Sequence, residues 1–208
     1  MNVRRTLPVV LVTILAGAAA WVLFVGLPRW YPPAAPAETS APAATSPAAG
    51  AARKITATLY YISEDGLSLV GVQQEVSFGD PIVEQARHIV QAQLGAAPAP
   101  LAAAVPGGTT LRAIYLTERE CDGPDAATCR RDAFIDLSVE ARTRHTGGAL
   151  DELFTIYAIV DSVTVNLPTI SRVQILVDGK EVDTLAGHVD LRHPLEKNLT
   201  WVRTEKDE

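Results

Sequence analysis

The chain has 208 residues, a formal net charge of −6 and 48% hydrophobic residues, which allows one ordinary domain with an appendage. The charges are spread unevenly, because residues 1–54 carry a net charge of +4 whereas residues 55–202 hold 11 basic and 20 acidic side chains. The resulting net charge of −9 over residues 55–202 repels nucleic acid and anionic lipid headgroups. No basic run with interleaved aromatic residues offsets this charge, so nucleic-acid binding is excluded.

Residues 7–27 (LPVVLVTILAGAAAWVLFVGL) form a run of 21 residues without a charged side chain. A helix rises about 1.5 Å per residue, so this run spans roughly 30 Å, the hydrocarbon thickness of a bilayer. Arg4 and Arg5 precede the run and Trp30 and Tyr31 follow it, which predicts a cytoplasmic N-terminus and an exported remainder. We therefore predict a single-pass anchor in the bacterial cytoplasmic (inner) membrane, with the domain in the periplasm or outside the cell membrane.

A cleaved signal peptide is the competing interpretation of the same segment. Ala18 and Ala20 provide a cleavage-like site, but the apolar run continues past them, whereas a cleavable apolar region spans about 7–15 residues. Both interpretations export the domain. Residues 28–54 are rich in Pro and Ala, which predicts an extended linker. The expected organisation is a cytoplasmic tip and transmembrane helix (1–27), a linker (28–54), a folded domain (55–202) and a charged tail (203–208).

The first part of the folded domain has the pattern of two strands followed by a helix. Residues 55–62 (ITATLYYI) are mostly β-branched or aromatic, and residues 70–78 alternate apolar with polar side chains, so both predict strands. Asp80 is the predicted N-cap of a helix with Pro81 at its first position. Apolar residues then recur at helical spacing to about Leu94.

The second part repeats this order. Strands are predicted over residues 110–116 and 134–137, and a second helix begins after Thr146-Gly147-Gly148. The order ββα-ββα-ββ, completed by a hairpin after this helix, predicts an α+β fold with two helices packed on a mixed, mostly antiparallel sheet.

The hairpin is predicted from Asp178-Gly179, which lies between two β-rich segments, residues 172–177 and 180–185. A two-residue turn of type I′ requires positive φ at both central positions. It also sets the register, in which Val177 lies opposite Lys180 and Ile175 opposite Val182.

Cys121 and Cys129 flank a short polar segment (CDGPDAATC) between two predicted strands. Because we place this segment outside the cytoplasm, a disulfide between them is the favoured interpretation. The spacing fits neither a C-x-x-C redox motif nor a zinc site. The acidic side chains near this segment lack the spacing of a calcium loop, so we expect a solvated acidic surface there. These side chains are Glu118, Glu120, Asp122, Asp125 and Asp132.

A search for an active site finds only partial arrangements. His188 and Asp190 lie on the same side of an extended segment and could orient a base, but no third metal ligand is near in the sequence. Asp136, Ser138 and His145 supply the residue types of a hydrolase triad without a nucleophile motif around the serine. Gly147 and Gly148 could offer free N–H groups to an anion, although glycines at a helix start more often serve the turn. We predict no catalytic residue, no metal and no cofactor.

Four motifs together resemble the GerMN domain family, over about residues 55–195. They are the FIDLS strand at residues 134–138, the GG-x₃-EL helix start from Gly147 and Gly148, the VQILVDG hairpin with Asp178 and Gly179, and GH-x-DL-x-x-PL with Gly187, His188 and Asp190. The resemblance implies a small α+β domain, tethered or lipidated outside the cytoplasm, of the kind found in sporulation and germination proteins. It brings no catalytic residues.

The anchor, the linker and the resemblance predict a non-catalytic interaction domain. Its expected partners are an envelope protein or peptidoglycan, in envelope assembly or in processes akin to sporulation and germination, with residues 7–27 in the membrane. A cell-wall hydrolase using His188 and Asp190, or a regulator of such an enzyme, is the alternative.

Overall fold

The computed structural model describes residue 21 and residues 53–118, 120–121 and 129–203. The chain divides into two compact units, Met1–Ala48 and Ala49–Glu208. All of the predicted anchor except Trp21 and nearly all of the predicted linker lie outside the described residues, so both remain predictions. Within the described residues, no helix is long and apolar enough to span a bilayer.

The second unit begins with a β-hairpin. Strands β1 (Lys54–Ile62) and β2 (Leu69–Ser77) pair antiparallel over nine residues without a register shift. Ala57, Leu59 and Tyr61 of β1 alternate along the strand and are fully buried, so they form one apolar face. Both predicted strands are therefore confirmed. They form a two-stranded sheet of their own.

The remaining strands form a separate, mixed sheet. Its central order is β3-β5-β6-β7, with β4 beside β5 and β8 beside β6. Strands β5 and β6 are parallel, and the other pairs are antiparallel. The strands are β3 (Leu111–Leu116), β4 (Glu120–Cys121), β5 (Cys129–Leu137), β6 (Ile170–Val177), β7 (Lys180–Glu181) and β8 (Leu195–Glu196).

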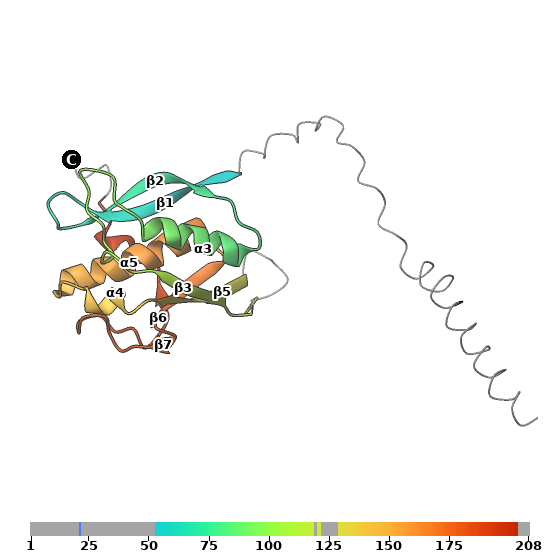
Figure 1. The fold of residues 1–208 in the computed structure, drawn as a ribbon. Coiled ribbons are helices and arrows are strands. Elements are labelled where there is room, and N and C mark those ends of the chain that lie inside the picture. The colour runs from blue at the N-terminus through green and yellow to red at the C-terminus, as the bar shows by residue number, and fades with distance from the viewer. Residues whose placement is uncertain (1–20, 22–52, 119, 122–128, 204–208) are drawn as a thin grey trace, which may run out of the picture. The chain divides into compact units, whose positions relative to one another are not determined.

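Helices α3 (Ile82–Gln93) and α5 (Ala149–Asn166) lie between the hairpin and the mixed sheet (Figure 1). The short helix α4 (Glu140–Thr143) precedes α5, and a 3-10 turn (Leu199–Trp201) follows β8. The prediction of an α+β fold with helices on a mixed sheet is confirmed. The single sheet was wrong, because the hairpin does not join the other strands and covers the helices from their opposite side.

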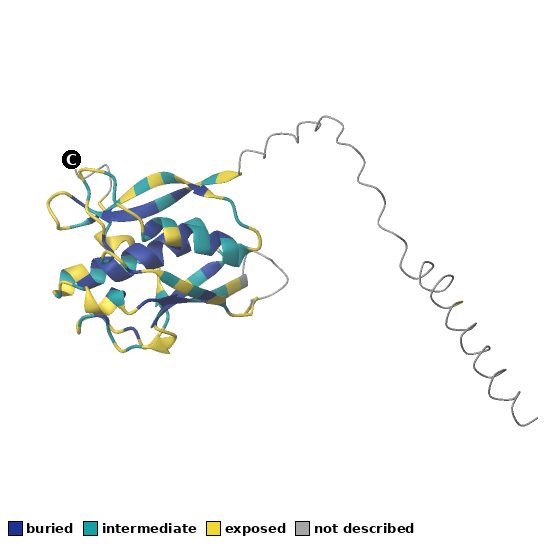
Figure 2. Ribbon diagram, viewed as in Figure 1, coloured by how far each residue is buried: buried dark blue, intermediate teal, exposed yellow. Residues whose placement is uncertain are grey.

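Helix α5 explains why two sheets are needed. Eleven of its residues are buried, on more than one face of the helix, and the helix is dark blue over most of its length in Figure 2. Phe154 and Ala158 pack with Tyr60 of the hairpin, whereas Ile156 and Val163 pack with the core of the mixed sheet. A helix that is apolar nearly all round must be covered on both sides.

The start of helix α3 differs from the prediction. Pro81 rather than Asp80 occupies the N-cap, and no side chain caps the helix. The Gln85 side chain instead bonds the preceding loop, because its Oε1 accepts from the Gly79 N–H at 2.8 Å and its Nε2 donates to the Ser77 carbonyl at 3.2 Å. The Asp80 cap was therefore wrong, while the predicted end near Leu94 is confirmed.

The β6–β7 turn confirms the predicted hairpin, but only over its first two pairs. Asp178 and Gly179 have φ of 51° and 74°, as a type I′ turn requires, and Val177 lies opposite Lys180. The predicted pairing of Ile175 with Val182 was wrong, because β7 ends at Glu181. The chain then leaves the sheet, and β8 takes the place beside β6.

Candidate functional site

The family-like motifs meet around the first turns of helix α5. Gly147 and Gly148 have φ of 85° and 94°, which residues with a Cβ rarely adopt. The Gly147 N–H donates to Nδ1 of His145 at 3.1 Å, and the Thr146 hydroxyl donates to Asp151 at 3.2 Å. The predicted helix start is confirmed. The Gly147 N–H is already bonded within this turn and does not point to an anion site.

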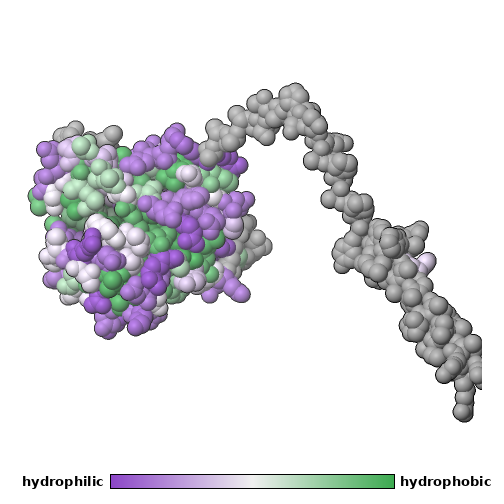
Figure 3. All heavy atoms as spheres, viewed as in Figure 1, coloured by the Kyte–Doolittle hydropathy of each residue, from purple (hydrophilic) through white to green (hydrophobic). Residues whose placement is uncertain are grey.

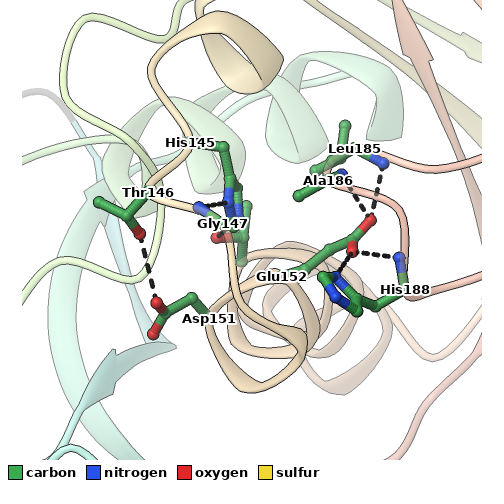
Figure 4. A network of polar contacts seen from close by, with 9 residues as sticks. His145, Thr146, Gly147, Asp151, Glu152, Leu185, Ala186 and His188 are labelled. Carbon is green, nitrogen blue, oxygen red and sulfur yellow. Dashed lines mark hydrogen bonds and ion pairs between the residues drawn. The ribbon is translucent and has the colours of Figure 1, made fainter.

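Glu152, one turn into α5, is the centre of the network in Figure 4. Its side chain is fully buried. Oε1 accepts the N–H groups of Leu185 and Ala186, both at 2.8 Å, and Oε2 accepts the N–H of His188 at 2.7 Å. The His188 ring adds a fourth contact, with Nδ1 at 3.1 Å from Oε2. Glu152 thus ties the GG-x₃-EL motif to the GH-x-DL motif, 36 residues further along the chain.

These donors determine the charge state of Glu152. Burial by itself raises the pKa of this carboxyl group, but the N–H groups of Ala186, His188 and Leu185 and the His188 ring outweigh it and hold the pKa below its ordinary value. Glu152 is therefore ionised at neutral pH, and its negative charge stabilises the loop over residues 185–188 through these hydrogen bonds.

The structure separates the predicted pair of His188 and Asp190. Gly187 has a φ of 105°, which turns the chain so that the His188 N–H and ring face Glu152. Asp190 instead binds Arg192, whose Nε and Nη2 lie 2.9 and 2.7 Å from its carboxylate oxygens. The imidazole is therefore oriented by Glu152 and not by Asp190, so the possible pairing of His188 with Asp190 does not form.

Asp136 of the FIDLS strand has a comparable role at the β6–β7 turn. It is buried, its Oδ1 accepts the Gly179 N–H at 2.7 Å, and its Oδ2 lies 3.2 Å from Nε of Arg112. Arg112 also contacts Asp178 at 3.2 Å. The motif residues Asp136, Asp178 and Gly179 therefore stabilise one another across the sheet.

The three residue types of a hydrolase triad do not meet. Oγ of Ser138 accepts the Thr110 N–H at 3.0 Å, whereas Asp136 contacts Gly179 and Arg112. Nε2 of His145 lies 3.3 Å from the hydroxyl of Thr155, which itself donates to the Ala104 carbonyl at 2.6 Å. Nδ1 of His145 accepts from the Gly147 N–H, so both ring nitrogens have partners within the fold.

His145 does face a small pocket of about 260 Å³. Arg144 contributes the positive charge of this pocket and also donates to the Gly107 carbonyl at 3.1 Å. Its polar lining is Arg144, His145, Thr146, Asp151 and Thr155, with apolar residues from Ile62 and the loop before β3. The pocket is a place where a small polar group could bind, and the Asp151 carboxylate in it accepts from the Thr146 hydroxyl at 3.2 Å.

The segment around the two cysteines is only partly described. Strand β4 pairs with β5 so that Cys121 lies opposite Cys129, and directly opposed residues have Cα atoms about 4.5–5.5 Å apart, within reach of a disulfide. The bond itself remains a prediction. Residues 122–128 lie outside the described residues, Asp122 and Asp125 among them.

The described acidic side chains near this segment do not gather into a metal site. Asp132 forms a two-pronged ion pair with Arg172, at 2.9 and 2.8 Å. In the part of the chain that the structure describes, no group of three or more His, Cys, Asp and Glu side chains could hold a metal ion.

Sequence reasoning missed Asp161, a second buried carboxylate of α5. The residue is fully buried, and its Oδ1 accepts the Asn198 N–H at 2.9 Å. Its Oδ2 is buried without a hydrogen-bond partner among the described residues. Burial raises the pKa of Asp161 to about 6, against smaller opposing effects of the Asn198 N–H and the Lys197 charge. A lone carboxylate within an apolar helical run (IYAIVDSVTV) is the signal that could have revealed it.

Comparison with known proteins identifies the family. The profile of the Germane family, described as sporulation and spore germination, matches residues 58–183, which is more than half of the chain. The chain belongs to this family. The predicted resemblance to GerMN domains is thereby confirmed. Among curated proteins, no sequence matches the chain.

Solved structures are also similar to this chain. A protein from Clostridium perfringens, described as a candidate lipoprotein, is 26% identical over 69% of this chain and 88% of its own, with a TM-score of 0.46. The first GerMN domain of the sporulation protein GerM from Bacillus subtilis is 18% identical over 69% of this chain and 96% of its own, with a TM-score of 0.45. The tandem GerMN domains of that protein are 18% identical over 71% of this chain, with a TM-score of 0.46. This chain spans 46% of that two-domain structure.

Proposed function

We propose that this Germane-family protein is a membrane-tethered, extracytoplasmic binding domain that contacts an envelope protein or cell-wall material and catalyses no reaction. One observation carries the proposal: the motif carboxylates suited to chemistry are bonded within the fold. Glu152 accepts hydrogen bonds from three main-chain N–H groups, and Asp136 accepts one from the Gly179 N–H in the β6–β7 turn. A general base needs a free lone pair directed at a substrate and a pKa near the operating pH, and Glu152 has neither.

The tether is part of the same proposal. The charge-free run over residues 7–27 and the Pro/Ala-rich segment after it support an anchor and a spacer. The family description supports a role in the envelope of the kind that sporulation and germination require. The tether is tested by intact-mass analysis of the membrane fraction, where we expect the uncleaved chain. Recovery of a soluble protein that starts near Trp21 would show that residues 1–20 are a cleaved signal peptide and not an anchor.

The binding role is tested by crosslinking the full chain in its native envelope. We expect an envelope protein or peptidoglycan fragment to be captured by the full chain and not by a control that keeps residues 1–54 and lacks residues 55–202. Equal capture by both would show that the anchor, and not the domain, makes the contact.

A second candidate, a cell-wall hydrolase, is favoured by the contact of His188 with Glu152. The His188 side chain is 44% exposed, so a carboxylate-oriented imidazole does reach the surface, as in many hydrolases. Against this candidate, the same carboxylate is saturated by main-chain donors, and Asp190 is bound to Arg192. The binding domain therefore remains the function that we propose.

A further inference from the structure

The outer edge of β1 is closed by other parts of the domain. Three alternate residues of β1 have both their main-chain N–H and their C=O bonded on the side away from β2. Two of them are bonded by a carboxamide side chain, which supplies one acceptor and one donor at 2.7–2.8 Å, as a neighbouring strand would. The third exchanges main-chain bonds of 2.8 and 3.0 Å. The pairs are Thr58 with Asn166, Tyr60 with Gln93, and Ile62 with Ala102.

These bonds show which residues of β2 direct their main chain outward. In an antiparallel pair, opposed residues alternate between bonding each other and bonding away from each other. Thr58 lies opposite Gln73, and Tyr60 lies opposite Gly71, so Gln73 and Gly71 point their main-chain groups away from β1. The same alternation includes Glu75, two residues further on.

The outer edge of β2 is closed only at its two ends. At one end, the Leu69 carbonyl accepts the Arg203 N–H at 2.8 Å. At the other, the Ser77 carbonyl is met by the side chains of Gln85 at 3.2 Å and His88 at 3.0 Å. Between them, Gly71, Gln73 and Glu75 are exposed and have no outward main-chain partner among the described residues. The open stretch over residues 71–75 is about 13 Å long at 3.3 Å per residue.

Strand β3, at the edge of the mixed sheet, is a less suitable edge. Its pairing with β5 shifts in register between Leu111 and Ala113, and such bulges hinder the addition of a further strand. Arg112 on this strand is also tied to Asp136. Strand β2, by contrast, has an unbroken register and carries a glycine at position 71, where no side chain obstructs an approaching backbone.

A hollow of mixed polar and apolar lining adjoins the open stretch, with Ser68 and Thr200 among its polar residues. Leu67 is 68% exposed and Trp201 is 37% exposed, and they line a shallow pocket of about 220 Å³ together with Val202 and Arg203. Val202 and Arg203 are also the residues that pair with Leu69 at the start of the open edge. Figure 3 shows polar side chains over much of the visible face of this unit, so affinity from main-chain bonds plus one apolar anchor suits this surface.

We propose that residues 71–75 of β2 accept an extended segment of a partner protein as an added strand, with an apolar side chain near its end against Leu67 and Trp201. Only a polypeptide backbone offers donors and acceptors at the spacing that these residues present. The net charge of −9 over residues 55–202 selects a segment that carries Lys or Arg. Glu75, at the end of the open stretch, is exposed but is paired with Lys54 at 2.8 Å, so the selection comes from the charge of the whole domain. This inference rests on the proposed binding function and narrows its partner to a protein.

The test uses the full chain in detergent micelles and a synthetic nine-residue peptide of alternating threonine and lysine that ends in leucine. Amide hydrogen exchange is followed by NMR. At saturating peptide we expect exchange at Gly71, Gln73 and Glu75 to slow at least about tenfold, since an added strand bonds these N–H groups. An alternating threonine–glutamate peptide should protect them less, because it is repelled by the net charge of −9 over residues 55–202.

Two proline variants check the geometry. Gln73→Pro removes an N–H that faces outward, which an edge strand tolerates, so the fold should persist while the protection is lost. Gln74→Pro is the matched control, because its N–H faces Ala57 of β1 and its loss should destabilise the hairpin. If Gln73→Pro also fails to fold, Glu75→Lys replaces it and should reduce the difference in protection between the two peptides.

Three results would overturn the inference. One is the absence of protection at residues 71–75, and another is protection at Arg112, Ile114 and Leu116 of β3 instead. The third is protection of residues 71–75 that is already present in the free chain. If removal of residues 204–208 abolishes it, the C-terminal tail covers the edge, and if dilution abolishes it, a second copy of the chain does. Envelope crosslinking of Gln73→Pro separates the two proposals: a partner retained by this variant leaves the binding function intact and refutes the edge.

Discussion

Helix α5 carries two buried carboxylates with opposite electrostatic outcomes. Glu152 and Asp161 are both fully buried, yet the pKa of Glu152 lies below its ordinary value whereas the pKa of Asp161 rises to about 6. Glu152 is met by three main-chain N–H groups and the His188 ring. Asp161 has one N–H donor, from Asn198, and a second oxygen without a partner among the described residues.

The difference shows that the number of donors must be weighed against the cost of burial to decide whether a buried carboxylate is charged. Each N–H bond stabilises the ionised form, whereas removal from water penalises it. At Glu152 the donors prevail, and the charge stabilises a loop. At Asp161 a single donor does not offset burial, so the ionised side chain is a net cost to the folded state at neutral pH.

The largest expected effect is that of Glu152→Gln. In glutamine one of the two oxygens is replaced by an amide nitrogen, which donates and cannot accept. This nitrogen would face N–H donors of the loop over residues 185–188 in a buried position. We therefore expect the free energy of unfolding to fall by about 3–5 kcal/mol. Chemical denaturation at pH 7 measures this loss. Asp151→Asn is the matched control, because Asp151 is exposed one residue away and should change stability by no more than about 0.5 kcal/mol. A similar loss in both variants would mean that the hydrogen bonds to Glu152 do not contribute the expected stability.

The pH dependence of the Glu152 contribution has a definite sign. Because the folded-state pKa is below the ordinary value, the contribution is complete above the unfolded pKa of about 4.5 and is lost as the pH falls through the lower folded-state pKa. The wild type should therefore lose more stability than Glu152→Gln as the pH is lowered below about 4.5. Parallel curves for the two proteins would contradict the lowered pKa.

Asp161→Asn should act in the opposite direction. Asparagine keeps an acceptor for the Asn198 N–H and carries no charge, so the variant should gain stability relative to the wild type at pH 7, by at most about 3 kcal/mol for a pKa raised from 3.8 to about 6. The folded state binds this proton more tightly, so wild-type stability should fall as the pH rises from about 4 to about 6 and then level off.

Denaturation of the wild type and Asp161→Asn at pH 4, 5, 6 and 7 measures this contribution. The advantage of the variant should grow through that window and stay constant above it. An advantage that is the same at every pH would show that Asp161 does not titrate there.

The smallest expected effect is that of His188→Ala. The variant removes one of the four contacts to Glu152 and leaves the three main-chain donors in place, so we expect a loss of about 0.5–1.5 kcal/mol. A thermal shift of a few degrees in a melting experiment corresponds to this value. A loss as large as that of Glu152→Gln would mean that the ring, and not the main chain, holds the carboxylate.

The local elements of this fold are readable from the sequence, but their long-range partners are not. The strands of the first hairpin follow a period of two residues, and Asp178-Gly179 fixes its own turn through backbone sterics. Whether the first hairpin joins the other strands depends on how many faces of α5 are buried, and the order of the predicted elements does not contain that number.

The motif residues show the same limit. The sequence places Gly147, Gly148, Gly187 and His188 in two conspicuous motifs, but nothing local indicates that Glu152 would bond the main chain of the second motif. Asp190 lies two residues from His188 and suggests a pair, yet the positive φ at Gly187 directs His188 to a carboxylate 36 residues away.

The central claim, that these motif residues build a binding domain and perform no chemistry, is tested most directly by turnover of purified peptidoglycan. The full chain and its His188→Ala variant are incubated with the substrate, with and without added zinc, and released fragments are quantified. We expect no turnover above buffer for either protein. Turnover by the wild type that is lost in a folded His188→Ala variant would contradict the claim and establish a hydrolase.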